Sequence, residues 1–133
     1  MNYLTEHPID SGEWHRRNAD LRDGACVEFL GIVRGDEEGR EIPYLDYEAY
    51  EAMAERKIAE LIEQAQKKWS LHRVYLRHRI GRVAVGEVSV IIRVQAPHRD
   101  EAFEACRFLI DAIKKDAPIW KKETCPEKLL ESF

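Results

Sequence analysis

The chain has 133 residues, of which 44% are hydrophobic and 35% charged, and its formal net charge is −4. This length predicts a single domain, residues 1–133, that buries a core without disulfides or metal ions, and the acidic balance argues against general nucleic-acid binding. No apolar run approaches the ~20 residues of a membrane span, and residues 1–10 lack the apolar core of a signal peptide.

The first fifty residues predict two strands. An irregular or short-strand entry over 1–10 precedes a short helix over 11–20, which Ser at its first position can cap. Alternating β-branched and aromatic residues predict a strand over 25–34, central in its sheet because both of its faces are mainly apolar. A polar loop, 35–40, leads to a second strand over 43–50. We expect these two strands to form a hairpin.

The middle of the chain predicts a helix and two further strands. Helical periodicity over 51–69 gives a buried side formed by Met53, Ile58, Leu61, Ile62 and Ala65. The run 71–80 alternates, with its arginines on the face expected to be exposed and His78 on the apolar face. Gly81 and Gly86 bracket a short excursion. The strand 88–96 follows, with three polar side chains expected to face outward: Ser89, Arg93 and Gln95.

The segment after residue 96 predicts the second long helix and a short extended tail. Asp100 is the expected N-cap, and Pro118 stops the helix. One buried stripe is expected, formed by Ala102, Phe103, Cys106, Leu109, Ile110 and Ile113. On a helical wheel Lys114 falls at the edge of this stripe, whereas Lys115 faces water. Alternation in the tail places Lys121 and Lys122 on opposite faces.

Basic residues around this helix are candidates for an anion site. His98 and Arg99 stand at the helix entrance, where free N–H groups attract anions, although a solvated turn explains them equally. Lys114 in apolar surroundings, near Lys121, would have a lowered pKa suited to proton transfer or nucleophilic attack. The alternative is a lysine whose stem covers the edge of the core. All four could converge on a single anion.

Other patterns in the chain point more weakly to chemistry. The basic run 72–82 would suit phosphate or RNA, but alternation favours an exposed strand face, with His78 as a core histidine. The three cysteines, Cys26, Cys106 and Cys125, lack close pairing and zinc-site spacing, so we expect packing roles in a reducing, cytoplasmic setting. Neither a metal nor a cofactor is expected. The element order β-β-α-β-β-α-β predicts an α+β fold with both helices on one side of the sheet.

Five segments, in the same order and spacing across about 100 residues, resemble the large, catalytic subunit of molybdopterin synthase. They are GACVEFLGIVR (24–34), LDYEAYEAMAERKIAEL (45–61), HRIGRVAVGE (78–87), APHRDEAFEA (96–105) and KKDAPIWKKE (114–123). The resemblance implies an α/β-hammerhead fold with a mixed or antiparallel sheet, two main helices and a smaller β subdomain. It also implies a homodimer within a heterotetramer, completed by a small ubiquitin-like sulfur-carrier subunit.

The same resemblance implies a sulfurtransferase activity. Two sulfurs pass from the carrier's C-terminal Gly-Gly thiocarboxylate to cyclic pyranopterin monophosphate, making the dithiolene of molybdopterin. The family's essential lysine falls on Lys114 and its second lysine on Lys121, while Arg34, His98 and Arg99 match its substrate-binding residues. Lys114 would transfer protons or stabilise an oxyanion, and Lys121 would assist or hold the carrier's terminal carboxylate.

One departure from the family concerns the C-terminus. Members often have a longer tail that delivers a basic residue into the neighbouring protomer, whereas here Lys128 is the only basic residue after Lys122. A non-catalytic dimeric module that binds an acidic peptide tail or a phosphate ligand is the alternative function. An RNA-binding domain that uses the 72–82 run is a third, and it predicts steeply salt-dependent binding.

Overall fold

The computed structural model describes residues 2–10, 21–37 and 39–122, so the expected helix over 11–20 and residues Cys125 and Lys128 lie outside the described part. The main sheet has the order β1-β6-β8-β2. These strands are β1 (Leu4–Thr5), β6 (Arg73–Arg79), β8 (Val88–Ala96) and β2 (Ala25–Ile32). Pairing of β1 with β6 is parallel and the other pairings are antiparallel, which makes the sheet mixed. The prediction that the strand over 25–34 is central in its sheet is wrong, because β2 lies at an edge of this sheet and β6 and β8 are its inner strands.

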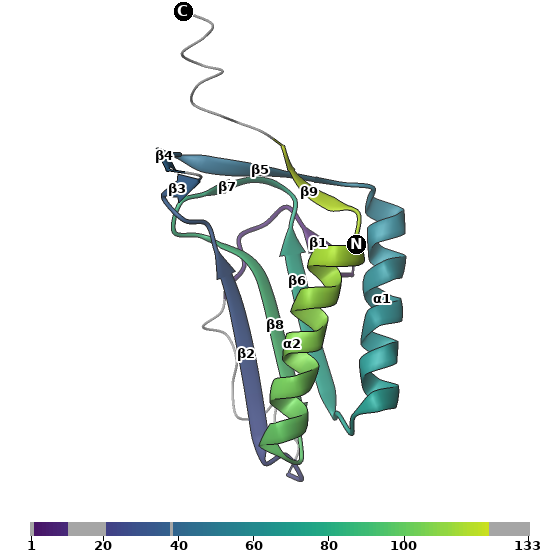
Figure 1. Ribbon diagram of the computed structural model, residues 1–133. Coiled ribbons are helices and arrows are strands. Elements are labelled where there is room, and N and C mark those ends of the chain that lie inside the picture. The colour runs from purple at the N-terminus through teal and green to yellow at the C-terminus, as the bar shows by residue number, and fades with distance from the viewer. Residues whose placement is uncertain (1, 11–20, 38, 123–133) are drawn as a thin grey trace, which may run out of the picture.

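Two long helices, α1 (Glu51–Lys68) and α2 (Arg99–Asp116), cover one face of this sheet (Figure 1). Their apolar residues recur at helical spacing and form one core with alternate residues of β6 and β8. In α1 the buried side chains are Ala54, Ile58, Leu61, Ile62 and Ala65, and in α2 they are Ala102, Ala105, Cys106, Leu109 and Ile113. The placement of both helices on one side is thus confirmed. No helix in the described ranges is long and apolar enough to cross a membrane.

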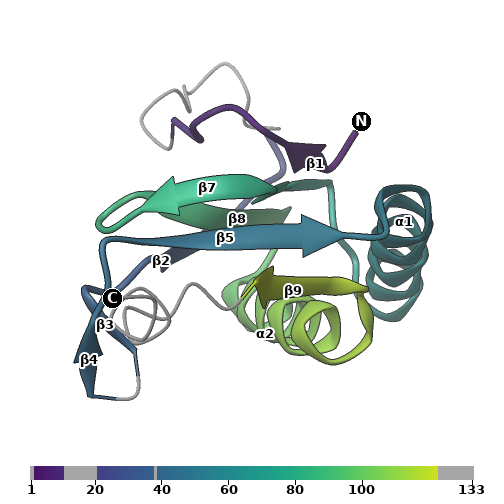
Figure 2. The ribbon, with the colours of Figure 1, turned by 90° about the horizontal axis from the view of Figure 1, so that it is seen from above.

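A smaller β unit lies across one end of the main sheet (Figure 2). It comprises a three-stranded sheet of order β7-β5-β9, from β7 (Gly81–Ala84), β5 (Tyr44–Ala49) and β9 (Ile119–Lys122), and the hairpin of β3 (Asp36–Glu37) with β4 (Arg40–Glu41). Its own core is Val33, Ile42, Leu45 and Val83. The expected α+β fold with a smaller β subdomain is confirmed.

The predicted hairpin between the first two strands is wrong. Strand β5 pairs antiparallel with β7 and β9, and β2 pairs with β8 instead. The loop assigned to 35–40 contains β3 and the start of β4, and the excursion after Gly81 is β7. Short strands of two to four residues carry too few positions for alternation to be recognised.

Helix α2 begins two residues earlier than expected, with His98 rather than Asp100 as the N-cap. Two expected core residues are on the surface: Phe103 is 60% exposed and Met53 is 53% exposed. Small alanines at neighbouring positions are buried instead, namely Ala54 in α1 and Ala102 and Ala105 in α2. Cys106 and Leu109 are buried as expected.

Several polar residues expected to face water are buried. Arg79, Ser89, Arg93 and Gln95 are between 1% and 7% exposed. Arg93 forms an ion pair with Glu28 at 2.7 Å, and the Arg79 guanidinium donates to the backbone carbonyls of Glu6 and Arg82. The face of the sheet away from the helices therefore carries buried polar side chains, whose partners include a charged residue of the neighbouring strand and backbone carbonyls.

Candidate active site

A cavity of about 540 Å³ lies where the main sheet, the end of α2 and the small β unit meet. Three basic side chains from distant parts of the sequence line it: Arg34, Lys114 and Lys121. Its apolar walls come from β2, β8 and α2, and its aromatic residues are Phe29, Tyr47 and Trp120. None of the described residues that line it carries a carboxylate, so this lining is positively charged and suits an anion.

Each basic residue reaches the cavity from the end of a regular element. Arg34 follows β2 by two residues, after a register shift at Gly31 and Ile32. Lys114 lies in the last turn of α2, where the helix dipole favours a cation. Lys121 lies on β9 opposite Tyr47, while its neighbour Lys122 turns away to pair with Glu48 at 3.7 Å. The predicted proximity of Lys114 and Lys121 is therefore confirmed.

Lys114 is more open to water than the helical wheel suggested. The apolar stripe ends at Ile113, and both Lys114 and Lys115 are exposed. What distinguishes the two lysines is the cavity, because Lys114 lines it and Lys115 does not. The expectation that Lys114 is held in apolar surroundings is wrong, since the cavity opens to solvent beside it.

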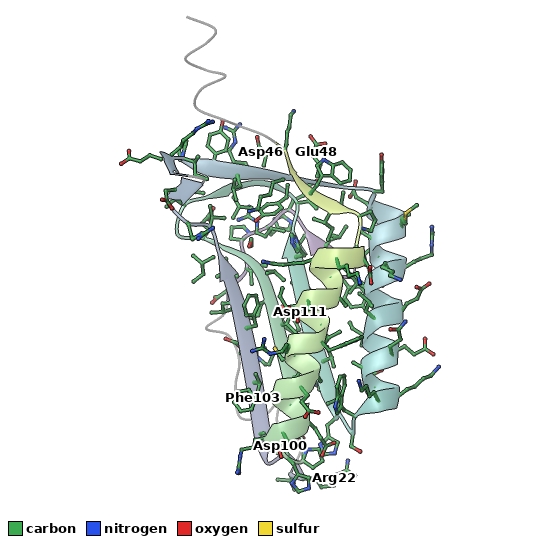
Figure 3. The ribbon with its side chains drawn as sticks, in the orientation of Figure 1. Arg22, Asp46, Glu48, Asp100, Phe103 and Asp111 are labelled. Carbon is green, nitrogen blue, oxygen red and sulfur yellow. The ribbon has the colours of Figure 1, made fainter. Side chains whose placement is uncertain are left out.

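His98 and Arg99 lie at the opposite end of α2. They border a separate depression of about 370 Å³ together with Gly24, Pro97 and Asp100. Arg99 and Lys114 are 15 residues apart in one straight helix, which separates them by about 22 Å along its axis. Figure 3 shows the same separation, with Asp100 at one end of α2 and Asp46 and Glu48 of β5 beyond the other. The predicted convergence of all four residues within one chain is wrong.

His78 also belongs to this cavity, although its alternation pattern suggested only a core histidine. It is 8% exposed, yet it lines the cavity beside Lys114. Its ring meets that of Tyr47 edge to face at 5.2 Å. The sequence offered one signal for this position, a titratable residue on the apolar face of a strand that ends near a glycine turn. This signal does not by itself distinguish a cavity wall from a core.

The basic run 72–82 does not form a free cationic surface. Arg79 is buried, Arg82 pairs with Asp46 at 3.2 Å and stacks on Tyr44, and Arg77 lies over the ring of Tyr75. These contacts occupy the guanidinium groups that RNA would need.

The two described cysteines are poor nucleophiles. Burial raises the pKa of the Cys106 thiol to about 11, and its Sγ lies 3.9 Å from the carbonyl oxygen of Ile92. Burial also raises the pKa of Cys26. Because the thiolate is the reactive form, and neither residue lines the cavity, neither thiol is a candidate nucleophile for the cavity. In the described ranges, no group of three or more His, Cys, Asp or Glu residues is arranged to hold a metal ion.

Gly31 is required by the packing of the cavity wall. A Cβ at this position would lie 2.6 Å from Cγ1 of Val90 and 3.3 Å from Oγ of Ser89. We expect Gly31→Ala to lower the free energy of unfolding by about 1–3 kcal/mol, because the neighbouring strand must move. Urea denaturation measures this change. Gly35→Ala is the matched control, since its Cβ would meet only Val85 at an ordinary 3.7 Å, and equal stability of the two variants would contradict the packing argument.

Comparisons with known proteins place the chain in a family. Residues 4–116 match the family described as MoaE protein. The molybdopterin synthase catalytic subunit of Thermoplasma volcanium is 50% identical over 120 residues, covering 90% of this chain and 88% of that protein. The protein of the same name from Nostoc sp. is 42% identical over 121 residues, covering 90% and 73%.

Solved structures agree with the sequence relatives. The crystal structure of molybdopterin synthase from Staphylococcus aureus superposes with a TM-score of 0.83 at 36% identity, covering 91% of this chain and 88% of that chain. A complex of subunits 1 and 2 of molybdopterin-converting factor from Helicobacter pylori gives 0.65 at 29% identity, covering 75% and 65%. The family match, the relatives and the shared fold show that this chain belongs to the MoaE family, the family of molybdopterin synthase catalytic subunits.

Proposed function

We propose that the cavity transfers sulfur from the C-terminal thiocarboxylate of a ubiquitin-like carrier subunit to cyclic pyranopterin monophosphate. The supporting observation is the convergence of Arg34, Lys114 and Lys121 on one cavity in a chain of the MoaE family. A phosphorylated pterin and a carrier tail are both anionic, and the residues lining the cavity are cationic or uncharged. The H. pylori complex of two subunits supports a small partner for this chain as well.

Each basic side chain in the cavity has a role that follows from the shape and charge of its functional group. Arg34 presents a planar fork of donors that suits the phosphate. Lys114 stabilises the negative charge that develops on the carrier's terminal carbonyl oxygen when its carbon is attacked, before the carbon–sulfur bond breaks. It also transfers protons to or from the attacking and leaving groups. Lys121, on the neighbouring strand, holds the carboxylate that the carrier tail becomes. Trp120 and Tyr47 supply flat walls for the pterin ring.

His98 and Arg99 enter this scheme through a second copy of the chain. Among the described strands β2 pairs only with β8, so the other edge of an eight-residue strand, ACVEFLGI, has unpaired backbone groups. Such an edge is disposed to pair with another strand. Antiparallel pairing of two β2 strands about a two-fold axis puts the start of one strand beside the end of the other.

Antiparallel pairing of two β2 strands would bring the cavity of one protomer close to the start of α2 in the other. Ala25, at the start of β2, pairs with Ala96, two residues before His98, and Arg34 follows the end of β2 by two residues. His98 and Arg99 of the partner subunit then approach the cavity of the first, where they add to the phosphate and pterin site. The homodimer is in this way part of the active site and lies within a heterotetramer with two carriers.

A cytoplasmic location completes the proposal. Cys26 and Cys106 are free thiols, which fits a reducing compartment.

Product analysis tests the function. The chain is incubated with carrier that bears a C-terminal thiocarboxylate and with cyclic pyranopterin monophosphate, and both are followed by mass spectrometry. We expect the pterin to gain two sulfurs and the carrier to return with an ordinary carboxylate. Binding of both ligands without product would instead support a non-catalytic module for acidic tails and phosphates.

A further inference from the structure

The imidazole of His78 has one proton position fixed by its surroundings. Nδ1 lies 2.7 Å from the carbonyl oxygen of Arg79, which accepts but cannot donate, so Nδ1 carries the hydrogen. In the uncharged ring Nε2 is then an acceptor with a lone pair. The backbone of His78 is fixed by its N–H, which donates to the carbonyl of Tyr3 at 2.8 Å, and the ring packs edge to face against Tyr47.

The surroundings of His78 favour the uncharged ring. Burial lowers the pKa of His78, the positive charge of Lys114 lowers it further, and the hydrogen bond to the Arg79 carbonyl partly opposes both. Among residues 2–10, 21–37 and 39–122, the titratable and charged groups that share the cavity with it are Arg34, Tyr47, Lys114 and Lys121, none of which is a carboxylate. His78 is therefore a neutral acceptor in a wall that is otherwise cationic.

A neutral hydrogen-bond acceptor can orient a lysine in an anion site without neutralising its positive charge. A carboxylate in the same place would form an ion pair with Lys114 and cancel the charge that attracts the substrate. An imidazole lone pair orients the ammonium through a hydrogen bond and leaves its charge in place. Lys114 lies on the last turn of α2, and its four-carbon stem gives Nζ several positions within the cavity, so some group must select one of them.

We propose that His78 is a positioning residue for Lys114: its Nε2 accepts a hydrogen bond from the lysine ammonium and holds Nζ toward the reacting carbonyl of the carrier tail. This rests on the proposed sulfur transfer for its role, but the coupling between the two side chains exists in the chain alone. Protonation of His78 at low pH would remove the acceptor and place a like charge beside Lys114.

The coupling is tested on the unliganded protein by ¹⁵N NMR of the histidine rings. At neutral pH we expect the Nδ1–H tautomer for His78 and a titration midpoint below the ordinary ~6.5. Lys114→Met should raise that midpoint by several tenths of a unit, because a neighbouring positive charge is removed. Lys115→Met, one residue along the same helix and outside the cavity, should leave it unchanged. An Nε2–H tautomer, or a midpoint insensitive to Lys114→Met, would overturn the proposal.

The positioning role is tested by sulfur-transfer kinetics of two variants. His78→Phe keeps a ring against Tyr47 but has no acceptor, and His78→Gln keeps an acceptor that does not titrate. We expect His78→Phe to lower kcat about tenfold or more with little change in KM for the pterin. His78→Gln should retain most of the rate, and the acid limb of its kcat–pH profile should move to lower pH.

The two experiments distinguish failure of the positioning role of His78 from failure of the proposed sulfur transfer. Wild-type rates in His78→Phe, or an equal loss in both variants, would refute the positioning role. A wild-type protein that makes no product would refute sulfur transfer, while the NMR midpoints would still decide whether His78 and Lys114 are coupled.

Discussion

Replacing Lys114 by alanine is expected to abolish sulfur transfer while the fold and the binding of the carrier remain intact. The side chain is exposed and ends in the cavity, so its removal leaves no buried void. It does remove the ammonium nearest to the proposed reacting carbonyl, and loss of one such stabilising group costs on the order of a hundredfold or more in rate. Product formation by mass spectrometry measures the loss, and thermal unfolding checks the fold.

Lys115→Ala is the matched control for this prediction. It removes the same charge from the adjacent position of the same helix turn, but Lys115 does not line the cavity. We expect wild-type rates for Lys115→Ala. Full activity of Lys114→Ala, with carrier and pterin supplied, would remove Lys114 from the mechanism.

Mixing two inactive variants is expected to restore activity if His98 and Arg99 serve the neighbouring protomer. Lys114→Ala and Arg99→Ala each damage one half of every site in their own dimers. After the subunits are exchanged, about half of the dimers are mixed. In each mixed dimer one site has lost both groups and the other has lost neither. We therefore expect about a quarter of the wild-type rate from the mixture, against a background near zero.

A second mixture controls for this complementation. Arg34 and Lys114 line the same cavity of the same chain, so no dimer of Arg34→Ala with Lys114→Ala contains an intact site. This mixture should stay inactive. Recovery in both mixtures would point to refolding or exchange artefacts, and recovery in neither would place His98 and Arg99 outside the neighbouring site.

The regular elements were predictable because their patterns are long. Strand β8 spans the nine residues Val88–Ala96, as its alternation indicated. The four-residue β9 (Ile119–Lys122) was placed instead by Pro118, which ends the helix before it. Strand pairing was not predictable in the same way, because the alternation of β5 is equally compatible with β2 or β7 as its partner. Only the three-dimensional placement of the small β unit decides between them.

Burial of charge was the second limit of the sequence. Alternation correctly puts Arg93 and Gln95 on the side of β8 away from the helices, but it does not show that Glu28 and Asp23 meet them there. A row of polar side chains on one face of a strand is interpreted as solvent-exposed unless the residues that pair with those side chains are known. His78 was misjudged for the related reason that a cavity wall and a core share one apolar pattern.

Two of the four grouped residues were placed correctly from the sequence. Lys114 and Lys121 lie on either side of Pro118 and are close along the chain, so local geometry alone brings them together. His98 and Arg99 lie at the first turn of α2, and the rise of 1.5 Å per residue over the length of the helix forbids their meeting Lys114 within one chain. What the sequence lacks is the position of the second copy.

The straight run of α2 also constrains how this chain can change over generations. Adding or deleting one residue inside the helix would turn everything beyond it by about 100°, carrying Lys114 out of the cavity and altering the span to His98 and Arg99. Insertions in exposed turns would move neither group. Descendant sequences can thus drift widely in composition along the water-facing side of this helix, while its residue count is inherited unchanged.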